Sequence, residues 1–303
     1  MLKRIAIMTS GGDAPGMNAF IRSATRHALE QGIEVYGVHQ GYQGMIDNLI
    51  KPLPREDTVN IIQRGGTILK TSRSQEFMTA EGREKAAANL RAHKIDGLIC
   101  CGGDGSYAGL VALSEQWSGK MIGTPGTIDN DVAGTDLTIG FDTAVNTAMS
   151  AIDNLRDTGD SHSMHFIVEV MGRHCGDIAT AVGKASGAEA ILVPETKSDL
   201  DAVYAALHDK GHNIVVVAEG DELGGAYQIA ELLKEKFCAS KADCKPNFRV
   251  CILGHIQRGG MPTARDRILA HEMGLESVNA LINGEHLKAV AIQKNKYLRT
   301  ELS

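Results

Sequence analysis

The sequence is poor in aromatic residues, which make up 4% of its 303 residues, and it has only a small excess of acidic charge, with a formal net charge of −6. A mildly acidic chain is poorly suited to a broad nucleic-acid surface or to an acidic membrane, so we expect neither partner. No apolar run approaches the roughly 18 residues that a membrane-spanning helix needs. An anionic ligand therefore requires a local concentration of arginine residues.

Cysteine is also sparse, and its spacing is uninformative. The six cysteines show no CxxC pair and no zinc-type spacing with histidine. They are Cys100, Cys101, Cys175, Cys238, Cys244 and Cys251. We expect reduced thiols in a cytoplasmic protein. The segment from Met1 to Ser10 lacks a long apolar core and a cleavage site, so we do not expect a signal peptide.

Glycine, in contrast, is abundant, with 34 residues, and 43% of the chain is hydrophobic. Short apolar runs alternate with helical patterns, as in an α/β protein with tight strand-to-helix turns. The expected strands are Arg4–Met8, Glu34–Val38, Ile95–Cys101, Lys120–Gly123, Phe166–Val170, Ala190–Val193, Asn213–Ala218, Arg249–Leu253 and Ala289–Ile292. These runs are apolar on both faces, which predicts parallel sheets covered by helices.

The order of these elements predicts two doubly wound α/β lobes with mostly parallel sheets and the active site in the cleft between them. We expect residues 1–139 and 251–292 in the larger lobe, residues 140–250 in the smaller lobe, and residues 293–303 as a short tail. Ligands of such sheets bind outside the carboxyl ends of the strands. The glycine-rich segments of this chain lie at such ends.

Two glycine-rich turns are candidate phosphate sites. Thr9–Gly16 (TSGGDAPG) offers backbone N–H groups at a helix start, but it lacks the Lys-Ser/Thr of a P-loop, and an ordinary tight turn explains it equally well. Gly102–Ser106 (GGDGS) lets phosphates approach the backbone. An acid at Asp104 would repel phosphate unless a cation intervenes, so Asp104 is a candidate Mg²⁺ ligand; a local turn is the alternative.

A third turn, Pro125–Asp131 (PGTIDND), carries two carboxylates two residues apart. One can accept a proton from an attacking hydroxyl while the other holds a metal. An Asx-rich turn is the alternative interpretation.

Arginines near glycines complete the pattern. Arg73, Arg173, Arg249 and Arg258, the last with His255, lie in loops or at strand ends, and the planar guanidinium binds two phosphate oxygens at once. A single arginine of this kind is often only a solvated surface residue. Several of them beside glycines favour phosphate binding.

The motifs TSGGDAPGMNA, GGDGS, PGTIDND, MGR followed by CGD, and GHIQRGG, in this order, resemble the phosphofructokinase family. The resemblance runs from Met1 to about Ile292 and is strongest to the short bacterial enzymes. It implies an ATP-dependent 6-phosphofructokinase of glycolysis, with ATP bound by the larger lobe and the sugar phosphate by the smaller lobe. It also implies Mg²⁺ as cofactor and a cytoplasmic homotetramer with active sites shared between subunits.

The resemblance also implies roles for individual residues. Asp129 is the expected base, with Thr127 and Arg173 as catalytic partners, and Asp104 and Asp131 are the expected Mg²⁺ ligands. The expected ATP-binding residues are Gly12, Tyr42, Arg73, Ser74, Gly103, Asp104, Gly105 and Ser106. The expected sugar-phosphate residues are Thr127, Asp129, Met171, Gly172, Arg173, Glu219, Arg249, His255 and Arg258. Of these, Arg249 is expected to reach into a neighbouring subunit.

The family divides by phosphoryl donor. Its pyrophosphate-dependent members carry GGDD and PKTIDND, whereas this chain has Gly105 and Gly126 at the two differing positions. We expect an acid at position 105 to repel ATP and a lysine at position 126 to fill space that the nucleotide needs. Glycine at both positions predicts ATP as the donor.

The chain departs from the family pattern at several positions. Met164 replaces an arginine that holds the 6-phosphate, and His165 next to it is the candidate substitute; Met78 replaces an arginine near the nucleotide. The change at Met164 keeps open a kinase for another sugar phosphate, such as sedoheptulose 7-phosphate. A pyrophosphate-dependent enzyme is disfavoured by the two glycines, and a non-catalytic relative by the presence of Asp104 and Asp129.

An allosteric site is the last expectation from the resemblance. The residues that match the family's effector site are Arg22, Arg26, Arg55, Arg156 and Glu189. A solvated helix face is the alternative for Arg22 and Arg26, because residues four apart share a face.

Overall fold

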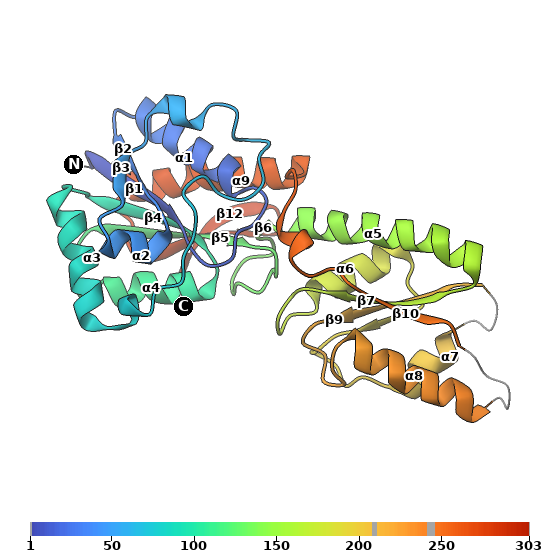
Figure 1. Cartoon of the computed structure of the whole chain (residues 1–303). Coiled ribbons are helices and arrows are strands. Elements are labelled where there is room, and N and C mark those ends of the chain that lie inside the picture. The colour runs from blue at the N-terminus through green and yellow to red at the C-terminus, as the bar shows by residue number, and fades with distance from the viewer. Residues whose placement is uncertain (1, 208–210, 241–245, 303) are drawn as a thin grey trace. The chain divides into compact units, whose positions relative to one another are not determined.

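The computed structural model describes residues 2–207, 211–240 and 246–302. The chain forms two compact units, which are described separately (Figure 1). Unit 1 comprises Met1–Ile128, Val132–Asp142 and Arg258–Ser303, and unit 2 comprises Asp129–Asp131 and Thr143–Gln257. The chain therefore passes from unit 2 back to unit 1 between Gln257 and Arg258, whereas the sequence analysis placed that boundary at residue 250.

Unit 1 is built on an eight-stranded sheet with the order β12-β11-β5-β4-β1-β2-β3, to which β6 adds by pairing with β5. Its strands are β1 Arg4–Thr9, β2 Glu34–Val38, β3 Ile50–Pro52, β4 Gly97–Gly102, β5 Lys120–Thr127, β6 Ile139–Gly140, β11 Lys288–Gln293 and β12 Lys296–Glu301. Only β3 and β12 run antiparallel to their neighbours. The sheet is mostly parallel because its central strands are buried on both faces, as their continuous apolar runs predict.

Helices cover both faces of this sheet (Figure 1). They are α1 Met17–Glu30, α2 Gly41–Ile46, α3 Ala80–Ala92, α4 Asp104–Leu113 and α9 Ala264–Ile282, with short 3₁₀ turns at Arg55–Thr58 and Glu76–Met78. Helices α1 and α9 pack together on one face, and α2, α3 and α4 lie on the other. Each strand-to-helix turn that follows β1 and β4 therefore ends at a helix N-terminus beside the sheet.

The expectation of a short tail at residues 293–303 is wrong. Lys296–Glu301 forms β12, which pairs antiparallel with β11 along its whole length. Lys294 and Asn295 connect the two strands, and both have positive φ, 49° and 62°. Such a pair matches the twist of a two-residue hairpin, and an asparagine is well tolerated there.

Unit 2 contains a four-stranded parallel sheet with the order β10-β7-β9-β8. Its strands are β7 His165–Val170, β8 Ala190–Leu192, β9 Asn213–Ala218 and β10 Phe248–Ile252, and its helices are α5 Phe141–His162, which begins in unit 1, α6 Asp177–Ser186, α7 Leu200–Ala206 and α8 Ala226–Ser240. A 3₁₀ turn, η3, spans Gly254–Arg258. Ile167 and Val215 of the sheet pack with Ile229 and Leu233 of α8 in the core.

Two further sequence expectations concern membranes and thiols. Within the residues that the structure describes, no helix has the length and hydropathy needed to cross a membrane. Cys100 and Cys101 are buried in β4, and burial raises the pKa of both thiols. Cys244 lies outside the described residues.

Candidate phosphate-transfer site

The first two glycine-rich turns lie side by side in unit 1. β1 and β4 are adjacent parallel strands, and the Ser10 N–H donates to the Cys101 carbonyl over 3.0 Å where both strands end. A Cβ built on Gly11 would lie 3.5 Å from the Ser106 hydroxyl, which belongs to the second turn. Both turns therefore present backbone at the same edge of the sheet.

The second turn is the N-terminus of a helix. α4 begins at Asp104, and Gly103 at the N-cap has no side chain that could accept from the first N–H groups. Asp104 and Gly105 are exposed, and a Cβ on Gly105 would have no atom within 4 Å. The protein itself does not require glycine at position 105. The first turn of α4 thus offers open space and N–H groups suited to an anion.

Tyr42 supports this helix from the buried side. Its ring is 7% exposed and stacks on Phe77, and its hydroxyl donates to the Ser106 carbonyl over 2.6 Å. Burial raises the pKa of the phenol well above its usual value. Tyr42 was predicted to lie near the nucleotide, and in the structure it supports the first turn of α4.

The loop that carries Arg73 lies on the surface of unit 1. Arg73 is exposed. Ser74 is occupied by local contacts, because its hydroxyl donates to the Gln43 amide oxygen over 2.8 Å and accepts from the Phe77 N–H over 3.1 Å. Met78, where the family has an arginine, is 75% exposed.

The third turn was predicted as a loop after Gly123, and this prediction is wrong for its first half. β5 continues through Thr127 and pairs with β4 as far as Pro125. A Cβ on Gly126 would lie 2.5 Å from the Cys101 sulfur, so packing inside unit 1 alone requires glycine at position 126. The space that a nucleotide needs can therefore explain the glycine at position 105, whereas packing within unit 1 explains the glycine at position 126.

The remainder of that turn belongs to unit 2 and contains the expected base. Asp129 is 3% exposed, and the Arg173 Nε lies 3.5 Å from its Oδ2. Asn130 has a positive φ of 56°, and its amide donates to Asp177 in the first turn of α6 over 2.8 Å. This bond fixes the turn, so Asp129 stays buried beside an exposed guanidinium.

The turn after β7 holds Arg173 in place. The Arg173 and Gly172 N–H groups both donate to one oxygen of Glu219, over 2.8 and 3.3 Å. The buried Met171 N–H donates to the Gln257 amide oxygen over 2.9 Å. Arg173 has a positive φ of 54°, which costs energy in a residue with a side chain. Two side chains therefore maintain an unfavourable backbone that directs Arg173 to Asp129.

The remaining residues expected at the sugar phosphate lie in and near η3 and β10. Arg249, on edge strand β10, and His255 are exposed. Arg258 belongs to unit 1, and a Cβ on Gly12 would lie 2.0 Å from its Nη1. Arg258 therefore lies directly on the first glycine-rich turn.

Among the described residues, no group of three or more His, Cys, Asp or Glu side chains could hold a metal ion. The expected ligands, Asp104 and Asp131, are both exposed. Mg²⁺ usually binds one or two carboxylates and takes its other ligands from water and substrate phosphates. Exposed acids next to turns that can bind phosphate therefore fit Mg²⁺.

Comparison with known proteins decides the family. A family model described as "Phosphofructokinase" matches residues 4–281. The chain is 54% identical over 288 residues to "ATP-dependent 6-phosphofructokinase 1" of Thermus thermophilus, covering 93% of this chain and 87% of that protein. It is 48% identical over 300 residues to "ATP-dependent 6-phosphofructokinase" of Bacillus subtilis, covering 97% and 91%.

The chain belongs to the phosphofructokinase family. A solved structure of phosphofructokinase from Saccharomyces cerevisiae superposes with a TM-score of 0.90 at 35% identity, covering 99% of this chain and 45% of the yeast chain. The chain thus spans less than half the length of that yeast protein. The resemblance inferred from the motifs and the α/β fold class are confirmed.

The structure contradicts the prediction that His165 binds the 6-phosphate. His165 was the candidate to replace the arginine missing at Met164. Its ring is 8% exposed and packs against Phe248, and its Nδ1 accepts from the Asn213 amide over 2.7 Å. The ring is therefore committed to the core of unit 2 and cannot reach a sugar phosphate.

The residues that match the phosphofructokinase effector site fall in both units. Arg26 donates to Thr58 in unit 1, and burial together with the charges of Arg22 and Arg55 lowers its pKa. Arg55 pairs with Glu30 at 3.2 Å.

In unit 2, the Arg156 guanidinium donates to the carbonyls of Ser186 and Gly187 at the end of α6. Glu189 accepts from the Ile214 N–H over 2.6 Å. Both side chains thus have local structural roles.

Two buried amide side chains within the predicted motifs were not expected from the sequence. Asn18 is buried; its amide donates to the carbonyls of Arg64 and Gly65, and its oxygen accepts from the Ile68 N–H over 2.7 Å. Gln257 holds the Met171 turn, as described above. Both residues lie inside motifs that were singled out, TSGGDAPGMNA and GHIQRGG. An amide that can donate and accept at once was the available signal.

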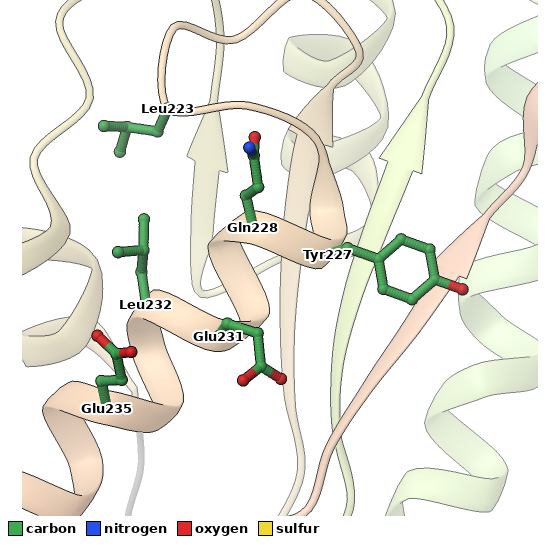
Figure 2. Close-up of a pocket in the computed structure, with 6 residues that line it drawn as sticks. All are labelled: Leu223, Tyr227, Gln228, Glu231, Leu232 and Glu235. Carbon is green, nitrogen blue, oxygen red and sulfur yellow. The ribbon is translucent and has the colours of Figure 1, made fainter.

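A surface depression lies along α8 (Figure 2). It is lined by Leu223, Tyr227, Gln228, Glu231, Leu232 and Glu235. Figure 2 shows Leu223 and Leu232 on one side of the helix and Tyr227 directed to the other side. None of these residues was predicted to bind a ligand, and Glu231 and Glu235 would repel a phosphate.

Proposed function

We propose that the protein is an ATP-dependent 6-phosphofructokinase, which transfers the γ-phosphoryl of ATP to the 1-hydroxyl of fructose 6-phosphate to give fructose 1,6-bisphosphate and ADP. The observation that carries this proposal is the buried Asp129 carboxylate 3.5 Å from the exposed Arg173 guanidinium. Such a pair can accept a proton from a hydroxyl and stabilise charge on a transferring phosphoryl group. The names of the Thermus and Bacillus relatives support the same reaction.

On the donor side, the ATP phosphates are proposed to bind at the first turn of α4. Gly103 and Gly105 contribute N–H groups there, and Gly105 leaves room for the nucleotide. Arg73 is exposed and free to turn toward the phosphates. Asp104 and Asp131 would hold Mg²⁺, which when bound neutralises phosphate charge.

On the acceptor side, Asp129 takes the proton of the 1-hydroxyl as the oxygen attacks phosphorus, and Thr127 holds the reacting end of the sugar. Arg173 stabilises the negative charge that develops on the phosphoryl oxygens. Glu219 contributes by fixing the Gly172–Arg173 backbone. In phosphoryl transfer, positioning and charge neutralisation of this kind supply most of the catalysis.

The 6-phosphate is proposed to bind Arg258 and His255, together with Arg249 from a neighbouring subunit. Arg249 pairs with Phe166, five residues before Met171 along β7. At about 3.3 Å per residue this separation is roughly 16 Å, longer than an arginine side chain. The Arg249 side chain therefore cannot contact the Met171 turn of its own unit, which favours a role in another subunit.

Self-association as the expected homotetramer accords with large apolar side chains that are exposed in each unit. They are Ile252 and Ile256 of unit 2, with exposed fractions of 48% and 60%, and Met261 and Ile268 of unit 1, with exposed fractions of 66% and 63%. Exposed apolar surface of this kind is typical of interaction sites. We also propose that the basic cluster of Arg22, Arg26 and Arg55 forms part of an effector site.

One coupled assay tests the function by comparing donors and acceptors. We expect turnover with ATP and fructose 6-phosphate, and little with pyrophosphate. Faster turnover of sedoheptulose 7-phosphate would favour the alternative that Met164 raises, a kinase for another sugar phosphate. Absence of transfer from ATP to any sugar phosphate would reject the proposal.

A further inference from the structure

Gly12 and Arg258 share one space in unit 1. A Cβ on Gly12 would lie 2.0 Å from the Arg258 Nη1 and 2.9 Å from its Cζ, closer than carbon atoms approach. The guanidinium therefore occupies the place of a side chain at position 12. The Arg258 Nε is buried and has no hydrogen-bond partner in the part of the chain that the structure describes, so only the end of the guanidinium is available to a ligand.

The backbone at position 12 does not itself require glycine. Gly11 has a positive φ of 82°, whereas Gly12 is absent from the positive-φ residues of the described chain. A side chain at position 12 is thus compatible with the backbone and is excluded by Arg258 alone. The atoms that it would meet are the end of a flexible side chain, which can move without unfolding the turn.

We propose that Gly12 is a positioning residue whose missing side chain admits the Arg258 guanidinium to the first glycine-rich turn, so that Gly12 sets sugar-phosphate affinity through Arg258. This inference rests on the proposed function, because it takes Arg258 as a ligand of the 6-phosphate. It also reassigns Gly12, which the sequence analysis placed only at the ATP phosphates. The ligand whose affinity Gly12 sets is a phosphate monoester, the phosphate group of the acceptor sugar.

The first test is steady-state kinetics of Gly12→Ala, Arg258→Ala and the double variant in the full-length protein. Gly12→Ala should raise the KM for fructose 6-phosphate on the order of 10-fold or more, as expected for loss of a charge-assisted hydrogen bond. kcat should change much less, because the 6-phosphate is held equally in ground and transition states. In the Arg258→Ala background, Gly12→Ala should add no further increase in this KM.

A matched control is Gly105→Ala, which adds the same methyl group to the neighbouring turn without meeting any atom within 4 Å. Its effect should add to that of Arg258→Ala, because the two positions do not share a space. A rescue experiment uses Arg258→Lys, whose slimmer and more flexible ammonium can bypass a methyl group. The Gly12→Ala, Arg258→Lys double variant should bind fructose 6-phosphate better than Gly12→Ala alone.

Two results would overturn the inference. One is a higher KM for ATP with an unchanged KM for the sugar phosphate, which would mean that Gly12 makes room for the nucleotide. The other is an equal effect of Gly12→Ala with and without Arg258. A wild-type protein that does not phosphorylate fructose 6-phosphate would instead reject the proposed function, so the two failures are distinguishable.

Discussion

The choice of phosphoryl donor can be tested with one added carboxylate, Gly105→Asp. Position 105 lies in the first turn of α4, and a Cβ built there meets no atom within 4 Å apart from its own chain neighbours and helix backbone. An acid in the first turn of a helix stabilises it by about 0.3–1 kcal/mol, and replacing glycine in a helix is also favourable. The variant should therefore unfold at the same temperature as the wild type or slightly higher.

Binding of ATP should respond in the opposite direction. A carboxylate about 5 Å from a phosphate, at an effective dielectric constant of about 20, is repelled by roughly 3 kcal/mol. This energy corresponds to an increase of roughly 100-fold in the KM for ATP. The effect should weaken as salt is added, because charges near the surface are screened.

The assay is steady-state kinetics with ATP as the varied substrate, with Gly105→Asn and Gly105→Ala as controls. Asparagine has nearly the shape of aspartate without its charge, and alanine reports the effect of losing glycine alone. The KM for ATP should follow the order Ala, Asn, Asp from lowest to highest, with the largest step at Asp. An unchanged KM in Gly105→Asp, or equal values for Asn and Asp, would refute the electrostatic account of donor choice.

Three further predictions concern catalysis, assembly and stability. Asp129→Asn should lower kcat roughly 10²–10⁴-fold with unchanged thermal unfolding, and activity within about threefold of the wild type would remove Asp129 as the base. Mixing Asp129→Asn subunits with Arg249→Glu subunits should restore activity; no gain in a verified mixed assembly would mean that each site comes from one chain. Burial lowers the pKa of His165, so the unfolded chain takes up a proton first as pH falls below about 6.5, and stability should decrease there. In His165→Gln, the denaturation midpoint should depend less on pH between about 7 and 5, and an equal dependence would exclude His165 as the cause.

The fold was predictable where burial is complete. Asn213–Ala218 was expected as a strand and forms β9 with the same bounds, and all six of its residues are buried. The prediction failed at β5, because Pro125 and Gly126 resemble a turn. The pairing of β5 with β11 ends at Gly123, so a proline at position 125 leaves that ladder intact. The position at which β5 stops pairing with β11 depends on tertiary structure, and the local sequence does not indicate it.

Tertiary contacts also limit what the sequence can predict about the site, as two glycines in the donor motifs illustrate. Both Gly105 and Gly126 were predicted to make room for ATP, because sequence comparison gives them the same meaning. In the structure, Gly126 faces the Cys101 sulfur, and Gly105 faces open space. A glycine that the protein's own packing requires carries no information about a ligand, whereas one that packing leaves unexplained does. Only a residue far away in the sequence distinguishes the two cases, which is why Gly105 and not Gly126 is the position at which donor choice should be tested.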